Sequence, residues 1–175
     1  ELDKKKLTTD EDTFAQEYLA EFKKFKGLIF KNFDRNVHVI EPFEIPNDGT
    51  WEIYRCIDFG FDNPTACGWI GVAPDNKWYL LDEYYETKES SDYHCGIILS
   101  KSASFPSAVV TWGDPSGPQV MSDWAKKGVY ITPARREGNT NKGEWVGGGI
   151  DIIQEKLKVS PIDKKPGLYI FKNCE

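Results

Sequence analysis

The stretches IYRCIDFGFDNPTA (residues 53–66) and AVVTWGDPSG (residues 108–117) decide the fold of this chain. In each stretch, a run of β-branched and aromatic residues ends at an aspartate, Asp58 or Asp114, and a turn rich in glycine and proline follows. Such a run is typical of a β-strand, and the turn marks the end of the strand. Carboxylates that two strands deliver to one sheet edge can hold hard divalent cations over a scissile phosphate. The pattern therefore predicts a metal-dependent phosphodiester hydrolase.

Each of these aspartates also has an ordinary structural explanation. Asp58 could stabilise the turn that leads to Gly60. Asp114 could occupy the first position of a DPSG turn. For either residue alone the two explanations are equally common. We favour metal binding because both aspartates end strands of one expected sheet.

Length and composition indicate one folded domain with an appendage. The chain has 175 residues, of which 39% are hydrophobic and 14% aromatic, enough for a substantial core. No apolar run approaches the length of a membrane span, so no membrane association is expected. The first residues, ELDKKKLTTDED, lack the apolar stretch of a signal peptide.

The cysteines and histidines do not suggest a zinc site. The four cysteines form no CxxC pair, and Cys56 and Cys67 are expected to be small buried residues of a reducing compartment. His38 and His94 are the only two histidines, and neither lies near a cysteine pair. His94 adjoins Cys95 on an expected helix, where neighbours face different directions, so both are interpreted as structural.

The net charge of −6 is unevenly distributed along the chain. Residues 46–125 hold four basic and twelve acidic side chains, whereas residues 126–172 hold ten basic and five acidic ones. A nuclease needs both kinds of region, carboxylates for metal ions and cations for the phosphate backbone. Two ordinary solvated faces would explain the same distribution.

The chain begins with a helical pattern and then changes to alternating strands and helices. Residues 10–26 predict a helix, residues 28–50 a connector, and a domain boundary is placed near residue 48. An antiparallel meander of three strands follows, with a helix, a strand, a helix, a strand, a third helix and a final strand after it. The strands are expected at 51–59, 65–73, 77–85, 107–112, 129–134 and 168–171, and the helices at 89–102, 118–128 and 146–158.

This order predicts an α/β domain with a ribonuclease-H-like mixed sheet, in which three antiparallel strands precede parallel strands and helices flank the sheet. In that arrangement the ends of the first and fourth strands of the domain are neighbours. The topology therefore predicts that Asp58 and Asp114 meet at one edge of the sheet.

Several strings of the chain, in the same order, resemble the nuclease half of the large terminase subunit of tailed bacteriophages. They are FAQEYLAEF (14–22), GLIF (27–30), IDFGFDNPTA (57–66), YLLDEYYE (79–86), GDPSGP (113–118), KGEWVGGGIDIIQEKLK (142–158) and LYIFKNC (168–174). No single string is specific, but the series covers nearly the whole chain. The resemblance implies a ribonuclease-H-like endonuclease that cuts concatemeric double-stranded DNA during viral genome packaging. It further implies two Mg²⁺ or Mn²⁺ ions held by residues matching Asp58 and Asp114, which would be both catalytic and metal-binding.

The chain departs from the family pattern at both ends. The family supplies a further acidic group from a helical segment beyond the LYIFKNC strand, and its packaging ATPase carries a glycine-rich phosphate loop. Neither is found in the sequence. The expected organisation is thus a helix and connector at residues 1–47, the tail of an ATPase domain, and a nuclease domain at 48–175 truncated at its carboxyl end.

Weaker candidates surround the two aspartates. Asp62, Asp82 and Glu83 could add metal ligands, although adjacent strand residues face opposite sides, so at most one of Asp82 and Glu83 can face the site. All three could equally be turn or solvated strand residues. For DNA binding, Arg135, Arg136 and Lys142 belong to a Gly/Asn-rich loop suited to phosphates, which could equally be a polar surface loop. Trp145 is the tryptophan favoured for DNA contact, whereas those in strand runs (Trp51, Trp69, Trp78 and Trp112) are expected in the core.

Two other functions fit parts of the sequence. A catalytically incomplete module that binds nucleic acid or couples to a motor would explain the missing acidic segment. A related transposase or junction resolvase would use the same metal chemistry, but it does not account for the strings at 14–22 and 168–174. By resemblance, the partners would be double-stranded DNA, the chain's own ATPase domain, the small terminase subunit and the portal. The place of action would be the bacterial host cytoplasm during virion assembly.

Overall fold

The computed structural model describes residues 29–106, 109–134 and 148–174. The chain divides into two compact units, Glu1–Lys31 and Asn32–Glu175, and the second unit contains the sheet. The domain boundary expected near residue 48 falls inside this second unit, because residues from Asn32 onward already belong to it. The helix predicted at residues 10–26 lies outside the described residues.

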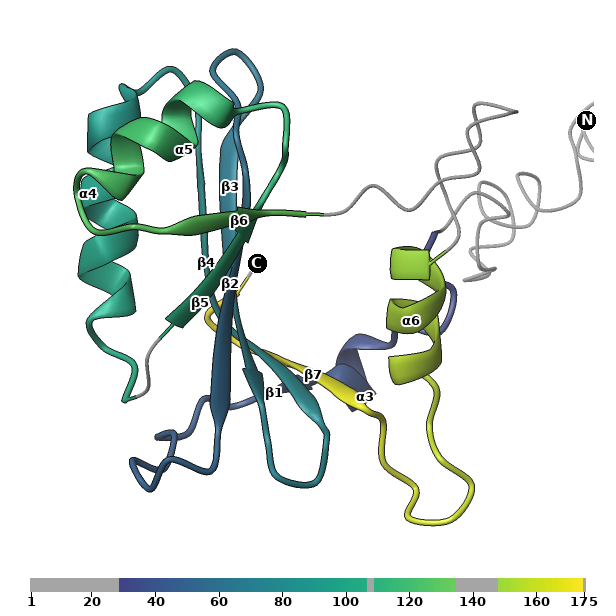
Figure 1. The fold of residues 1–175 in the computed structure, drawn as a ribbon. Helices are drawn as coiled ribbons and strands as arrows, with labels where there is room; N and C mark the ends of the chain where they lie inside the picture. The colour runs from purple at the N-terminus through teal and green to yellow at the C-terminus, as the bar shows by residue number, and fades with distance from the viewer. Residues whose placement is uncertain (1–28, 107–108, 135–147, 175) are drawn as a thin grey trace, which may run out of the picture. The chain divides into compact units, whose positions relative to one another are not determined.

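A seven-stranded mixed sheet forms the centre of the second unit (Figure 1). Its strands lie in the order β1-β7-β4-β3-β2-β5-β6. The pairs β2–β3 and β3–β4 are antiparallel, and the other four neighbouring pairs are parallel. The bounds are β1 Val39–Ile40, β2 Glu52–Asp58, β3 Thr65–Val72, β4 Trp78–Glu86, β5 Val109–Gly113, β6 Ile131–Pro133 and β7 Leu168–Phe171.

The predicted ribonuclease-H-like order is confirmed, including the parallel pairing of the first and fourth strands of the predicted domain, β2 and β5. Sequence reasoning missed β1, a two-residue strand that pairs with β7. Such a short edge strand has no pattern of its own in the connector, because its position depends on the partner strand. The helices among the described residues are α3 Arg35–His38, α4 Ser91–Ser102, α5 Pro118–Ala125 and α6 Gly148–Lys156.

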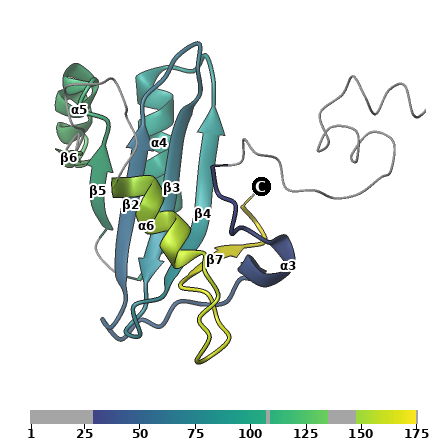
Figure 2. The ribbon, with the colours of Figure 1, turned by 90° about the vertical axis from the view of Figure 1, so that its right-hand side faces the viewer.

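The helices lie on both sides of the sheet. In Figures 1 and 2, α4 and α5 lie on one side and α6 on the other. We call the α4 and α5 side the covered face and the opposite side the open face. Strand β2 shows the difference, because Ile53, Arg55 and Ile57 are buried whereas Cys56 and Asp58 are exposed. The prediction that Cys56 is buried is therefore wrong: strand alternation turns it to the open face.

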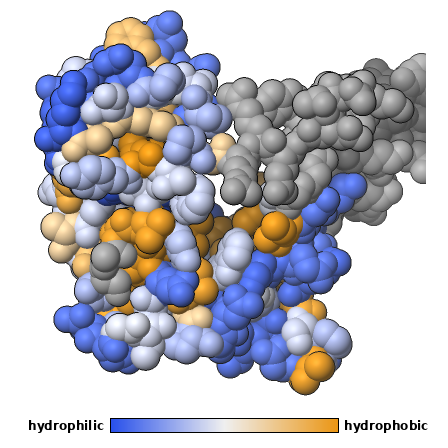
Figure 3. Space-filling model, in the orientation of Figure 1, coloured by the Kyte–Doolittle hydropathy of each residue, from blue (hydrophilic) through white to orange (hydrophobic). Residues whose placement is uncertain are grey.

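The sheet is not fully covered by these helices. Figure 3 shows a mostly hydrophilic surface that is interrupted by hydrophobic patches, one of them near β5. In β5, Val110 and Trp112 are 48% and 38% exposed, whereas the residue between them, Thr111, is buried. Apolar side chains of this strand therefore remain in contact with solvent on the open face.

Packing on the covered face explains the position of α4. Its N-cap Ser90 accepts a hydrogen bond from the backbone N–H of Tyr93 at 3.1 Å. Trp69 of β3 is fully buried and donates through Nε1 to the hydroxyl of Ser102, at 3.0 Å. The covered face is thus a well-packed core that holds β2, β3 and β5 in place.

His94 and Cys95 of α4 are both buried, as a structural role requires. The His94 Nδ1 lies 2.6 Å from the hydroxyl of Tyr84, whereas its Nε2 is a buried atom with no hydrogen-bond partner among the described residues. Burial lowers the pKa of His94. We therefore treat this imidazole as neutral in the folded protein.

Candidate active site

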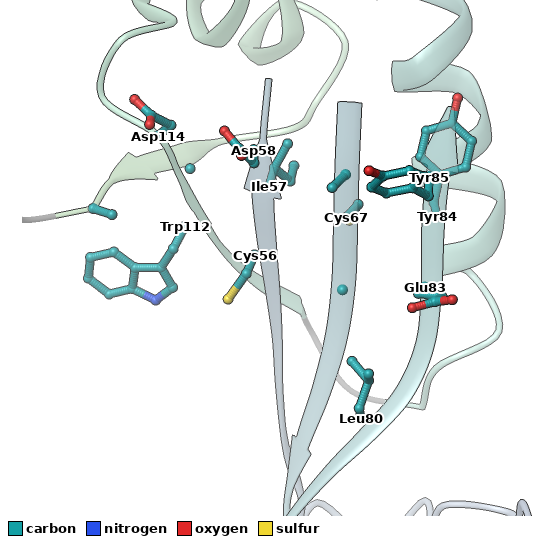
Figure 4. Close-up of a pocket in the computed structure, with 14 residues that line it drawn as sticks. Cys56, Ile57, Asp58, Cys67, Leu80, Glu83, Tyr84, Tyr85, Trp112 and Asp114 are labelled. Atoms are coloured by element: carbon teal, nitrogen blue, oxygen red, sulfur yellow. The ribbon is translucent and has the colours of Figure 1, made fainter. Parts of the chain in front are cut away.

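Asp58 and Asp114 come together because β2 and β5 are parallel neighbours that end at the same level. Ile57 and Gly113 form the last residue pair between the two strands, and each aspartate follows directly. The Asp114 N–H extends the ladder by donating to the Ile57 carbonyl at 3.1 Å. In Figure 4 both carboxylates rise from the ends of these strands toward the same side. The topological prediction is met, while the role of these residues in metal binding stays a prediction.

The chain turns sharply after Asp58, which leaves this aspartate at the rim of the sheet. The Thr65 hydroxyl accepts a hydrogen bond from the Gly60 N–H (3.2 Å) and donates to the Gly60 carbonyl (2.9 Å). A Cβ at Gly60 would lie 2.3 Å from the carbonyl oxygen of Asn63, so the turn requires glycine. Phe59 packs edge-on against buried Trp124, with ring centroids 5.5 Å apart. This packing anchors the end of β2.

Asp114 opens the turn that leads into α5. Its Oδ1 accepts a hydrogen bond from the Ser116 N–H at 2.6 Å, which orients the carboxylate. A Cβ at Gly117 would lie 2.6 Å from the ring of Phe59, so the turn packs directly on the residue after Asp58. The structural role predicted as the alternative for Asp114 is therefore present, and it is compatible with a site because it fixes the carboxylate's direction.

A pocket of about 400 Å³ lies beside the two aspartates on the open face (Figure 4). Three of its lining residues are acidic, namely Asp58, Glu83 and Asp114. The remaining lining residues are small, apolar or aromatic: Cys56, Ile57, Ala66, Cys67, Gly68, Leu80, Tyr84, Tyr85, Trp112, Gly113 and Ala134. The pocket thus combines carboxylates with a largely apolar wall.

The two adjacent acids of β4 face opposite ways, as strand alternation predicts. Glu83 pairs in register with Gly68 and lines the pocket. Asp82 pairs with Trp69, and its carboxylate lies 2.7 Å from the Lys101 ammonium of α4 on the covered face. Asp82 is therefore not a metal candidate. Glu83 lies two strands from Asp58, roughly 10 Å between backbones, which is too far for both to bind one ion directly.

The other predicted site residues do not join this pocket in the described structure. Asp62 is an exposed residue of the β2–β3 loop and is not among the residues that line the pocket. Arg135, Arg136, Lys142 and Trp145, the predicted DNA-binding residues, lie outside the described residues. Their roles stay predictions.

Sequence reasoning missed Trp112. The strand pattern predicts this tryptophan in the core with Trp51 and Trp69, which are indeed buried, but it is 38% exposed and lines the pocket. The signal was available in the strand itself. Residues two apart on a strand share a face, so a functional Asp114 places Trp112 on the open face as well.

The donor set fits a divalent ion only in part. Within residues 29–106, 109–134 and 148–174, no group of three or more His, Cys, Asp or Glu side chains is placed to hold a metal ion. Mg²⁺ is commonly bound through one or two carboxylates together with waters and substrate phosphates. Asp58 and Asp114 satisfy that requirement for carboxylates.

None of the helices in these same ranges is long and apolar enough to cross a membrane.

The strand order and the paired aspartates define the class of the domain, which has a ribonuclease-H-like fold. No model of a protein family matches the chain. Over 103 residues the chain is 29% identical to the large terminase subunit of Escherichia phage T5, a match that covers 56% of this chain and 24% of that relative. The chain thus spans about a quarter of the curated relative, and the match supports the resemblance drawn from the sequence strings.

Solved structures give the same fold. The P22 large terminase nuclease domain superposes with a TM-score of 0.64 at 17% identity, covering 85% of this chain and 74% of that one. The large terminase of a thermophilic bacteriophage superposes with a TM-score of 0.61 at 19% identity, covering 83% of this chain and 34% of that one. The HK97 bacteriophage large terminase superposes with a TM-score of 0.53 at 13% identity, covering 72% of this chain and 32% of that one. At these identities the likeness concerns the fold.

Proposed function

We propose that this chain is the nuclease domain of a phage large terminase subunit and that it cuts double-stranded DNA at the Asp58–Asp114 site. The observation that carries the proposal is the meeting of these two carboxylates at the ends of parallel neighbouring strands. The similarity to the T5 large terminase subunit supports the choice of this nuclease class over a transposase or resolvase.

The residues of the site suit two-metal hydrolysis of a phosphodiester. Asp58 and Asp114 would hold Mg²⁺ or Mn²⁺, which prefer carboxylate oxygen. When bound, the ions supply Lewis-acid stabilisation of the attacking and leaving oxygens. The Ser116 N–H orients the Asp114 carboxylate, and the packing of Phe59 on Trp124 holds the end of β2. The chain thereby fixes the ligand positions before substrate arrives, which avoids reorganisation during the reaction.

The negative charges of Asp58 and Asp114 explain why DNA binding at this site would require divalent metal ions. Two neighbouring carboxylates repel each other, and they also repel the phosphate backbone of DNA. Divalent ions remove both repulsions at once. Affinity for DNA at this edge would therefore rise with bound metal, and the basic loop residues Arg135, Arg136 and Lys142 would add sequence-independent attraction.

The partners and place of action follow from the same proposal. They would be the chain's own ATPase domain, the small terminase subunit, the portal and concatemeric DNA in the bacterial cytoplasm. A catalytically incomplete module that binds nucleic acid is the second candidate. It is favoured by the lack of a group of three metal ligands within the described residues.

Nicking of a supercoiled plasmid separates the two candidates. The protein is incubated with plasmid in Mn²⁺, in Mg²⁺ and in EDTA, and conversion to nicked and linear forms is measured. We expect metal-dependent cleavage that Asp58→Asn and Asp114→Asn each reduce by about a hundredfold or more, the scale of losing a main charge-stabilising group. Asp92→Asn is the matched control, because it makes the same change at an exposed residue of α4 that does not line the pocket. DNA binding without cleavage in any metal would support the incomplete module.

A further inference from the structure

The pocket is lined by one exposed aromatic residue on the strand of Asp114 and by another two strands from Asp58. Trp112 of β5 and Tyr85 of β4 both line it and are 38% and 70% exposed. Between their strands, β2 and β3 contribute the small residues Cys56, Ala66 and Gly68 to the wall. Exposed aromatic rings that line the same pocket can mark a ligand-binding surface.

Register places Trp112 next to the candidate site and Tyr85 two strands away from it, on the same face. Trp112 precedes Asp114 by two residues on the same face of β5, a separation of roughly 7 Å along the strand. Tyr85 pairs with Ala66, which in turn pairs with Asp58, so the ring and the carboxylate lie on one line across the sheet. Figure 4 shows Trp112 below Asp114, with its ring directed away from β2. A nucleotide adjoining a phosphate held at Asp114 would reach this ring.

We propose that Trp112, with Tyr85, stacks on unpaired bases next to the scissile phosphate, so that the site takes DNA that is locally unpaired. This inference rests on the proposed nuclease function. A pocket of about 400 Å³ has the size of a small-molecule site, which suits a single nucleotide better than a duplex. Aromatic side chains stack on bases of any sequence, but only bases that have left the duplex expose their faces to them. Trp112 and Tyr85 are therefore the residues that select unpaired DNA over paired DNA.

Binding in EDTA tests stacking without requiring cleavage. A labelled oligothymidylate and an abasic oligodeoxyribose phosphate of equal length are titrated with the full chain. We expect the oligothymidylate to bind about 5- to 150-fold more tightly for each stacked base. Trp112→Leu should lose most of this preference and Trp112→Phe should keep it, because only phenylalanine retains an aromatic face. Tyr130→Ala is the control, since Tyr130 is 75% exposed but does not line the pocket.

Cleavage gives an independent readout. In Mn²⁺ the unmodified protein should cut a duplex with a short central bubble faster than a fully paired duplex, and Trp112→Leu should reduce that ratio. An equal affinity for the base-containing and abasic strands would overturn the inference, as would a preference unchanged in Trp112→Leu. Loss of the nuclease function is recognised separately, because it would abolish cleavage of every substrate while leaving the EDTA binding preference intact.

Discussion

The guanidinium of Arg55 and the hydroxyl of Thr111 join β2 to β5 on the covered face. Arg55 is only 4% exposed, and its Nε and one terminal nitrogen donate to Thr111 Oγ1 at 3.1 and 2.7 Å. The other terminal nitrogen donates to Ser102 Oγ at 2.6 Å. The pair lies three residues before Asp58 and Asp114 in the same register, so it supports the strand pairing that brings these aspartates together.

Removing the Thr111 hydroxyl, which accepts hydrogen bonds from Arg55, should lower the free energy of unfolding more than removing the Arg55 charge. Thr111→Val leaves a buried guanidinium without its main acceptor, and we expect a loss of about 2–3 kcal/mol in the free energy of unfolding. Arg55→Met removes the guanidinium itself, so no buried charge is left without a partner, and this variant should be less destabilising. Urea unfolding of both variants and the double variant measures the coupling. A larger loss for Arg55→Met than for Thr111→Val would contradict this account.

The two aspartates should oppose folding when no metal is present. Asp58→Asn removes a repulsion between neighbouring carboxylates, so we expect an unchanged or slightly higher Tm in EDTA. In the unmodified protein Mn²⁺ should raise the Tm in proportion to the logarithm of its concentration, because it binds the folded state. Asp58→Asn should lose this rise. With only two carboxylates as ligands, calorimetry should show modest affinity, and two tight sites would show that groups other than Asp58 and Asp114 complete the cluster.

The opposite directions of Asp82 and Glu83 give a paired prediction. Glu83→Gln changes the charge of the pocket and should shift the Mn²⁺ concentration needed for half-maximal cleavage. Asp82→Asn breaks the contact with Lys101 on the covered face, so it should lower stability by about 1 kcal/mol or less and leave the Mn²⁺ dependence unchanged. Cleavage titrations in Mn²⁺ and thermal unfolding of the two variants distinguish these effects. A change in metal dependence for Asp82→Asn alone would reverse the assignment.

His94 should make the fold less stable in mild acid. Because burial lowers the pKa of His94 in the folded state, the unfolded chain binds its proton first, near pH 6.5. Stability should therefore fall as the pH drops below about 6.5, by at most about 1.4 kcal/mol per pH unit, and His94 should contribute no slope well above it. Urea unfolding of His94→Gln between about pH 7.5 and 5.5, the range that spans the ordinary histidine pKa, should show a flatter dependence. Tyr84→Phe should keep the slope, since it removes only the hydrogen-bond partner.

The loop cations Arg135, Arg136 and Lys142 should contribute salt-dependent DNA affinity. If each contacts one phosphate, the triple alanine variant should reduce the slope of log K against log salt by about 2.7 in magnitude. Fluorescence anisotropy with a labelled duplex at several salt concentrations measures the slope. An unchanged slope would show that these residues are solvated surface.

Sequence reasoning predicted the sheet well because its signals are local. The runs at 52–58, 65–72 and 78–86 end at turn residues, and the strand–helix alternation after them allows few topologies. The prediction failed in assigning individual strand residues to one or the other face of the sheet. Cys56 and Trp112 each lie two residues before a candidate aspartate, which places them on that aspartate's face, but their apolar character alone does not tell which face α4 and α5 cover. The choice depends on where α4 and α5 pack, which is a property of the tertiary structure.

The pairing of β2 with β5 also governs when activity can arise during folding. Arg55 and Thr111 are 56 positions apart, so the strands meet only after a long loop has closed, and such parallel pairings form late. Until that moment Asp58 and Asp114 belong to separate regions of a partly folded chain, and neither alone can hold a metal cluster. Under the proposed function, a newly made chain would not cut DNA until these two strands have paired. Metal binding, followed in time, would report the moment at which β2 and β5 pair.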